Sequence, residues 1–204
     1  MFQVVTPNLP GPYYAIAHST GGNILIRALA ARSWFRKAAV TAPLVGLLYG
    51  NWPLPIVHVL VFLSNWSGFG WLFLPGQRKR PMGRDDFPGN PLTSDQWRWE
   101  RDSGTLEAAP HLGSGAPTFA WLRAAMKSTA KLKRMNARTA LYSPLLLVMA
   151  GMDRVVDNEA IRRFASRVPS VSLITIAEAQ HEILTETDTV RNQFLAAFDS
   201  FVEG

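Results

Sequence analysis

The chain has 204 residues, of which 48% are hydrophobic, and this size and composition suit one globular domain with a substantial core. The absence of cysteine excludes disulfides, thiol catalysis and a cysteine-bound metal site, and with no signal-peptide pattern at the N-terminus we expect a cytoplasmic location. The net charge of +6 favours anionic surfaces, but no RNA-binding, zinc-finger or basic-zipper signature appears, so we expect no nucleic-acid partner.

The first predicted elements are a short apolar strand, residues 13–17, and a helix that follows a tight turn. On that turn Ser19 has the small residues Ala17 and Gly21 two positions before and after it. This is the pattern of a nucleophile elbow, in which a strained backbone projects the serine hydroxyl above the sheet. Because Ala17 replaces the first glycine of G-x-S-x-G, an incidental serine on a glycine-rich or phosphate-binding turn is the alternative.

A second strand is predicted at residues 37–41, and residues 38–77 contain no charged side chain. A transmembrane span is one interpretation, but Pro53, Pro55 and several polar residues divide the stretch into pieces too short to cross a bilayer. We favour a lid or cap with an apolar underside, one that also touches a membrane surface being a further option. The alternative is an ordinary buried helix at 56–63 with no ligand role.

A polar loop follows, whose charged residues are Arg78, Lys79, Arg80, Arg84, Asp85 and Asp86. We interpret it as a solvated loop, and cations that face a phosphate head group are the alternative. Two helices are predicted next, one capped near Ser94 or Asp95 and one over residues 118–135 with a solvated basic stripe.

The last third of the chain alternates strands and helices. Strands are predicted at residues 145–151 and 171–176, and helices at 158–167 and 188–202. This alternation predicts a parallel sheet that is covered by helices on both faces.

Two residues in this last third complete a catalytic pattern. A nucleophilic serine needs an acid and a histidine, which in this architecture follow it in that order. Asp153 follows the predicted strand at 145–151, and His181 follows the one at 171–176. Because ligands bind at the carboxyl ends of strands in an open sheet, we expect both side chains to meet Ser19 there.

The expected roles follow from this order. Ser19 would attack an ester carbonyl, and His181 would take the hydroxyl proton and return it to the leaving alcohol. Asp153 would hold the imidazole in the correct tautomer, and the backbone N–H of Thr20 would donate to the oxyanion.

Other candidates fit less well. His18 should point away from the neighbouring hydroxyl, His58 is expected to be a packed, hydrogen-bonded histidine, and His111 precedes the acid in sequence. The rival acids, which come too late or lie too close to His181, are Asp157, Glu178 and Glu182.

Five segments together carry a resemblance to a known family: AHSTGGN, NPLTSDQWRWERD, PTFAWLRAA, PLLLVMAGMDRVVDN and QHEILTETDTVR. The chain resembles the bacterial lysophospholipases of the monoacylglycerol-lipase-like α/β-hydrolases, which are grouped with serine-aminopeptidase-type hydrolases. The resemblance implies an α/β-hydrolase fold with a helical cap, hydrolysis of a monoacyl lipid ester, and Ser19, Asp153 and His181 as nucleophile, acid and base. It implies no metal or organic cofactor.

The chain also differs from the family that it resembles, in the part that precedes the elbow. Family members match this chain only after several N-terminal strands and a His-Gly loop that supplies a second oxyanion N–H, so we expect a truncated hydrolase with a partial parallel sheet. Loss of one such donor typically costs about 2.7–4 kcal/mol of transition-state stabilisation. The expected parts are a core segment with the elbow at 1–43, a helical apolar cap at 44–117, and a core segment with acid and base at 118–204.

Three functions therefore stay open. The first is a serine esterase acting on lysophospholipids or monoacylglycerols. The second is an aminopeptidase or short-chain esterase of the same fold, in which Asp85, Asp86 or Glu100 would bind a substrate ammonium. The third is an inactive truncated hydrolase or a lipid-surface binding fragment, because fold alone does not guarantee function.

Overall fold

The computed structural model describes residues 9–32, 34–50, 52–76, 87–139 and 141–204. The charged residues of the predicted polar loop, from Arg78 to Asp86, lie outside them.

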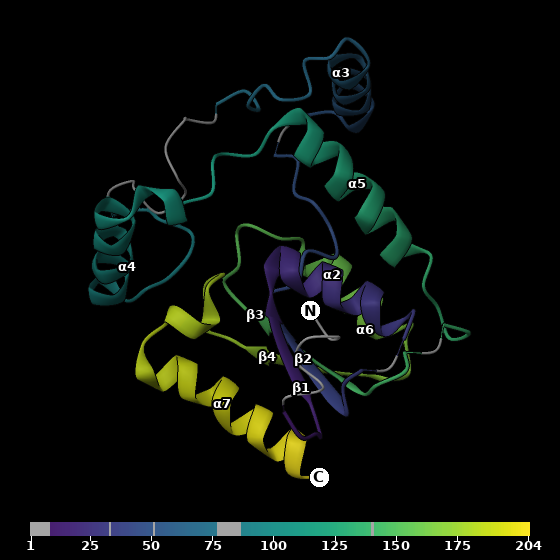
Figure 1. Cartoon of the computed structure of the whole chain (residues 1–204), viewed down its shortest axis with the longest axis vertical. Helices are drawn as coiled ribbons and strands as arrows, with labels where there is room; N and C mark the ends of the chain where they lie inside the picture. The colour runs from purple at the N-terminus through teal and green to yellow at the C-terminus, as the bar shows by residue number, and fades with distance from the viewer. Residues whose placement is uncertain (1–8, 33, 51, 77–86, 140) are drawn as a thin grey trace.

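A parallel sheet forms the centre of the molecule (Figure 1). Its strands, in spatial order, are β1 (Tyr14–His18), β2 (Lys37–Thr41), β3 (Leu145–Ala150) and β4 (Val171–Ile176). The predicted strands differ from these by one residue at most. Within the described sheet β1 is an edge strand, and the side chain of Ile16 is exposed.

The sequence of β3 explains why this strand lies inside the sheet. All six of its residues are buried, as expected for a continuous apolar run in a parallel strand that is covered on both faces. Leu145, Leu147 and Met149 pack into one hydrophobic cluster, whereas Leu146 and Val148 pack into another. Because successive side chains of a strand point to opposite faces, this one apolar run contributes to two separate hydrophobic clusters.

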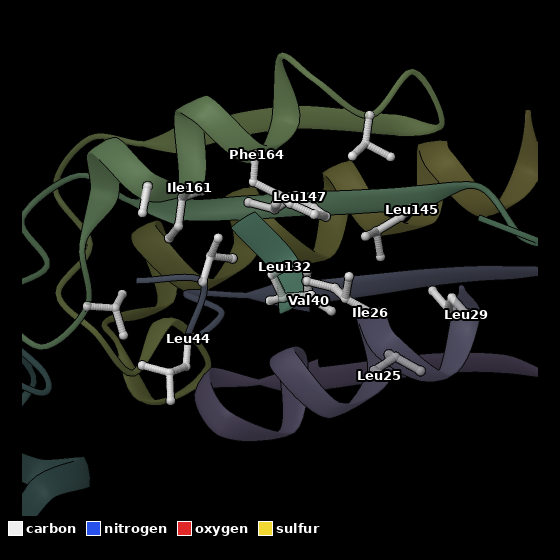
Figure 2. Close-up of a cluster of buried hydrophobic side chains, with 14 of the residues drawn as sticks. Leu25, Ile26, Leu29, Val40, Leu44, Leu132, Leu145, Leu147, Ile161 and Phe164 are labelled. Carbon is white, nitrogen blue, oxygen red and sulfur yellow. The ribbon is translucent and has the colours of Figure 1, made fainter. Parts of the chain in front are cut away.

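Helices cover both faces of the sheet (Figure 1). On one face lie α2 (Ser19–Leu29), α5 (Phe119–Lys133) and α6 (Asn158–Ala165), and their apolar residues form the cluster shown in Figure 2 with Val40 and Leu147. On the other face lies α7 (Asp188–Glu203), whose Phe194 is fully buried. The predicted α/β class with a parallel sheet is therefore confirmed.

Two helices lie away from the sheet, α3 (Leu54–Trp66) and α4 (Gln96–Ala108) (Figure 1). In α3 only Val57 and Val61 are buried, where they pack against Leu122 of α5. The alternative of an ordinary buried helix at 56–63 is therefore wrong. Across the described ranges, none of the helices combines the length and the apolar character that membrane crossing requires.

Side-chain caps define where several helices begin. Asp95, one of the two predicted caps, accepts a hydrogen bond from the backbone N–H of Arg98 at the start of α4. Thr118 caps α5 and Asp157 caps α6 in the same way. Two short 3₁₀ helices, η1 (Pro110–Leu112) and η2 (Ile183–Thr185), complete the described elements.

Candidate active site

The turn between β1 and α2 presents Ser19. Its φ angle is 51°, a left-handed conformation that non-glycine residues rarely adopt, as expected for a nucleophile elbow. A Cβ atom on Gly21 would lie 3.8 Å from the Cβ of Ala17, an ordinary contact, whereas one on Gly22 would lie 2.9 Å from the Cβ of Pro43. The tightest approach at this turn therefore falls on Gly22, one residue later than the G-x-S-x-G pattern suggests.

The loop after β3 holds Asp153 with its side chain fully buried. Its Oδ1 accepts hydrogen bonds from the backbone N–H groups of Val155 (2.7 Å) and Val156 (3.1 Å). Its Oδ2 lies 2.8 Å from Nδ1 of His181. The backbone donors thus fix one oxygen and aim the other at the imidazole.

The loop after β4 places His181 between the other two groups. Its Nε2 lies 3.0 Å from Oγ of Ser19, and the ring is almost fully buried. Because a carboxylate only accepts hydrogen bonds, Nδ1 carries the proton, and Nε2 is left to accept one from the hydroxyl. The three residues that were singled out from the sequence therefore form one hydrogen-bonded chain.

A fully buried carboxylate holds the loop that carries His181, and sequence reasoning missed it. Oε1 of Glu186 accepts a hydrogen bond from the backbone N–H of Gln180 (2.8 Å). Oε2 accepts from both the backbone N–H (3.1 Å) and the hydroxyl (2.5 Å) of Ser94. Ser94 directly precedes Asp95, the N-cap of α4, so Glu186 anchors both the loop of His181 and the segment that enters α4.

A second histidine lies beside the first. His18 points away from the Ser19 hydroxyl, as expected, and its Nδ1 lies 3.0 Å from Oγ1 of Thr41. Its ring packs edge-on against that of His181, with 4.7 Å between centroids, and its Nε2 lies 3.4 Å from Oε1 of Glu182. This packing could not be predicted from the sequence, because it depends on how the loop after β4 folds back over the end of β1.

Burial and charge act in opposite directions on Glu182. Burial alone would raise the pKa of its carboxyl group, but the hydrogen bond and charge of His18, with the charge of His181, together lower the pKa below its ordinary value. The carboxylate is therefore ionised at neutral pH.

The rival candidates have other surroundings. Asp157 caps α6 by accepting from the backbone N–H of Ala160 at 3.0 Å. His58 is exposed on α3, so the expectation of a packed, hydrogen-bonded histidine is wrong there, and His111 and Glu178 are exposed as well.

A cavity of about 990 Å³ opens beside Ser19 and His181. Thr20, in the first turn of α2 where backbone N–H groups have no partner within the helix, also lines it. The rest of its wall is mostly apolar and comes from the segment around residues 44–52, from α3 and from the start of α5, with Leu47, Leu60 and Leu122 among its residues.

Comparison with known families gives one match over most of the chain. The Hydrolase_4 family model, described as "Serine aminopeptidase, S33", matches residues 2–188. The chain is 26% identical over 191 residues to the probable lysophospholipase L2 of Haemophilus influenzae, and 29% identical over 212 residues to the lysophospholipase L2 of Escherichia coli K12. The alignments cover 93% and 94% of this chain but only 59% and 58% of those relatives.

Solved structures share the fold at lower sequence identity. A soluble variant of monoglyceride lipase from Saccharomyces cerevisiae, in complex with a substrate analog, has a TM-score of 0.66 and 18% identity, covering 93% of this chain and 61% of that one. The monoacylglycerol lipase of Paleococcus ferrophilus has a TM-score of 0.67 and 16% identity, covering 99% of this chain and 72% of that one. At such identities the comparison establishes the fold alone.

Proposed function

Because the chain belongs to the Hydrolase_4 family of serine aminopeptidases (S33), an α/β-hydrolase family, we propose that it is a serine hydrolase that cleaves carboxylic esters of monoacyl lipids. The observation that carries the proposal is the hydrogen-bonded chain from Asp153 through His181 to Ser19 at the wall of an apolar cavity. The substrate would be a lysophospholipid or a monoacylglycerol.

The proposed reaction has two halves. Oγ of Ser19 attacks the ester carbonyl carbon while Nε2 of His181 takes the hydroxyl proton, and the Thr20 N–H donates to the oxyanion. Collapse of the tetrahedral intermediate breaks the ester bond and transfers the proton from His181 to the leaving alcohol, which leaves an acyl-enzyme. Water, activated by the same imidazole, then hydrolyses the acyl-enzyme, and Asp153 stabilises the imidazolium in both halves.

The cavity supports an acyl chain as the main recognised group. Its apolar wall favours burial of a hydrocarbon chain, and a volume of about 990 Å³ lies at the upper end of the range for small-molecule pockets. The relatives named lysophospholipase L2 support the same substrate class. For an aminopeptidase, Asp85 and Asp86 lie outside the described residues, and Glu100 accepts a hydrogen bond from Gln96 on the exposed surface of α4.

A serine-reactive fluorophosphonate probe tests the nucleophile. We expect the purified, folded chain to be labelled, Ser19→Ala to lose labelling, and the exposed control Ser200→Ala to keep it. A folded chain that is not labelled, or that is labelled equally after Ser19→Ala, would contradict the proposal and favour the inactive or lipid-binding alternative.

A comparison of substrates tests the specificity. We expect kcat/KM to be highest for a long-chain lysophosphatidylcholine or monoacylglycerol, lower for a short-chain ester and lowest for an amino-acid anilide. The highest value for the anilide would instead identify an aminopeptidase.

We also propose peripheral membrane contact through α3 and the residues after it. Trp66 and Trp71 are 79% and 69% exposed, and most other side chains of α3 are apolar and exposed. Aromatic side chains of this kind favour the membrane interface.

We expect the double variant Trp66→Ser/Trp71→Ser to sediment less with anionic lipid vesicles than the wild-type chain. The control Trp97→Ser, on the exposed surface of α4, should sediment as wild type. Equal sedimentation of all three would contradict membrane contact.

A further inference from the structure

Three potential metal ligands meet beside the proposed nucleophile. One ligand atom from each of His18, His181 and Glu182 lies within 4.8 Å of those of the other two. His18 ends β1, and the other two residues lie in the loop after β4. Two imidazoles and a carboxylate are a common ligand set for Zn²⁺ in proteins, with water in the fourth position.

The other nitrogen of each ring is already occupied, which fixes the ring orientations. Nδ1 of His181 bonds to the carboxylate of Asp153, and Nδ1 of His18 bonds to the hydroxyl of Thr41. Metal-binding histidines almost always have such an outer partner, which sets the tautomer and leaves the second nitrogen free to bind. In His18 that second nitrogen, Nε2, is buried and faces the Glu182 carboxylate at 3.4 Å.

Distance and charge both favour an ion at this position. Ligands of a tetrahedral zinc ion at its usual bond lengths lie about 3.4 Å apart, so the cluster needs to contract by little more than 1 Å. Oε1 of Glu182 and Nε2 of His18 already lie 3.4 Å apart, so the contraction concerns the distances to His181. The Glu182 side chain, 35% exposed on a loop, can adjust to it. The carboxylates of Glu182 and Asp153 would together balance the charge of a divalent cation.

We propose that His18, Glu182 and Nε2 of His181 form an inhibitory site for Zn²⁺. The ion would take the lone pair of Nε2, so His181 could no longer accept the proton of the Ser19 hydroxyl. The inhibitory effect rests on the proposed function, whereas binding itself does not. The ion is a reversible inhibitor here and not a cofactor, because it occupies the base that the reaction needs.

Calorimetric titration with ZnCl₂ tests the site without any assay of activity. We expect one ion per wild-type chain, and affinities more than tenfold weaker for His18→Phe and Glu182→Gln. His18→Phe keeps an aromatic ring against His181, and melting curves check that each variant is folded. Thr41→Val removes only the outer partner and should weaken binding about tenfold. The control His58→Asn, which removes an exposed histidine of α3, should bind as wild type.

The rate of fluorophosphonate labelling tests inhibition. We expect Zn²⁺ to slow labelling of the wild-type chain, EDTA to restore it, and Ser19→Ala to bind the ion still. Absence of zinc binding, or equal affinity in His18→Phe and Glu182→Gln, would overturn the site. Zinc binding that leaves labelling unchanged would overturn its inhibitory position. A chain that is not labelled even without zinc would contradict the proposed function, and calorimetry alone would then decide the metal site.

Discussion

The sheet core and the segment that carries α3 are both rich in large apolar residues, but these side chains are buried in the core and mostly exposed in α3. In the core, Leu147, Phe164 and Phe194 are completely buried. In α3, by contrast, Phe62 and Trp66 are 61% and 79% exposed. Apolar composition therefore does not by itself predict burial, which requires a second apolar surface for the side chain to pack against.

The reason for the difference lies in how each region is covered. Every residue of β3 faces helices on one side of the sheet or the other. Helix α3 packs on α5 through one narrow strip, Val57 and Val61, and also contributes to the wall of the cavity. Burial of the apolar side chains of the core thus stabilises the fold. The apolar side chains around α3 stay exposed, where they can contact a ligand or a membrane surface.

The largest expected effect is the loss of activity when Asp153, in the loop after the core strand β3, is replaced. In Asp153→Asn, the amide oxygen can still accept from Val155 and Val156, while the amide nitrogen would face Nδ1 of His181. The histidine would then carry its proton on Nε2 and could not accept one from Ser19. We expect a loss of about 10⁴-fold in kcat with the fold retained, measured with a lysolipid substrate.

A matched substitution of the rival acid controls this result. Asp157→Asn changes a helix cap that lies outside the hydrogen-bonded chain, so it should leave kcat within about twofold and lower stability by at most about 1 kcal/mol. An equal loss of activity in both variants would contradict the assignment of the acid to Asp153.

The next effect compares one substitution in the two regions. Leu147→Ala should lower the free energy of unfolding by about 2–5 kcal/mol, because it opens a cavity in the centre of the sheet. Leu63→Ala, in α3 where the side chain is 49% exposed, should change it by no more than about 0.5 kcal/mol. Urea unfolding measures both, and similar losses would show that α3 is covered more fully than the structure indicates.

The same contrast explains how much of the fold could be predicted. The strands at β2, β3 and β4 and the helix at α7 follow from apolar runs and periodicity, because their burial is decided by the pattern itself. The relation of α3 to its surroundings did not follow, since a helix that is apolar on every side has no preferred face. The exposure of His58 is a consequence of the same ambiguity.

The site likewise contains residues that could be predicted from the sequence and one that could not. The order of serine, acid and histidine at strand ends singled out Ser19, Asp153 and His181, and the structure brings their side chains together. Their catalytic roles stay a prediction until the variants are assayed. The buried carboxylate of Glu186 could not be predicted, because its partner Ser94 lies far away in sequence and no motif links the two.

An intermediate effect is expected at Glu186, which joins the loop of His181 to the segment that enters α4. Glu186→Gln places an amide NH₂ against either the N–H of Gln180 or the N–H and hydroxyl of Ser94, so at least one buried donor loses its acceptor. We expect a loss of about 1–3 kcal/mol of stability. Because Gln180 directly precedes His181, we also expect kcat to fall more than KM changes.

The exposed Glu178 in the same loop provides a control. Glu178→Gln should leave both stability and kcat near wild type, as judged by urea unfolding and lysolipid hydrolysis. A Glu186→Gln variant that loses stability but keeps kcat would limit this anchor to a purely structural role.

The smallest effect concerns the ion pair that joins α4 to α7, between Arg98 and the exposed Asp188. The Arg98 hydrogen bond, with the charges of Arg191 and Arg98, lowers the pKa of Asp188 below its ordinary value of 3.8. The unfolded chain therefore binds this proton more readily than the folded chain does. The stabilisation is complete well above the ordinary pKa and is lost as the pH falls through the lower folded-state pKa.

Asp188→Asn should therefore lower the melting temperature slightly at neutral pH, and the difference from wild type should shrink towards zero in acid. The control Asp199→Asn removes the same charge from an exposed position on the same helix, so its difference from wild type should vary less with pH. Melting curves recorded from neutral to acid pH, at low and high salt, measure both, and screening should reduce the Asp188 effect at high salt. A difference for Asp188→Asn that is equally large in acid would contradict the charge as its origin, because protonation removes the charge of Asp188 from the wild-type chain as well.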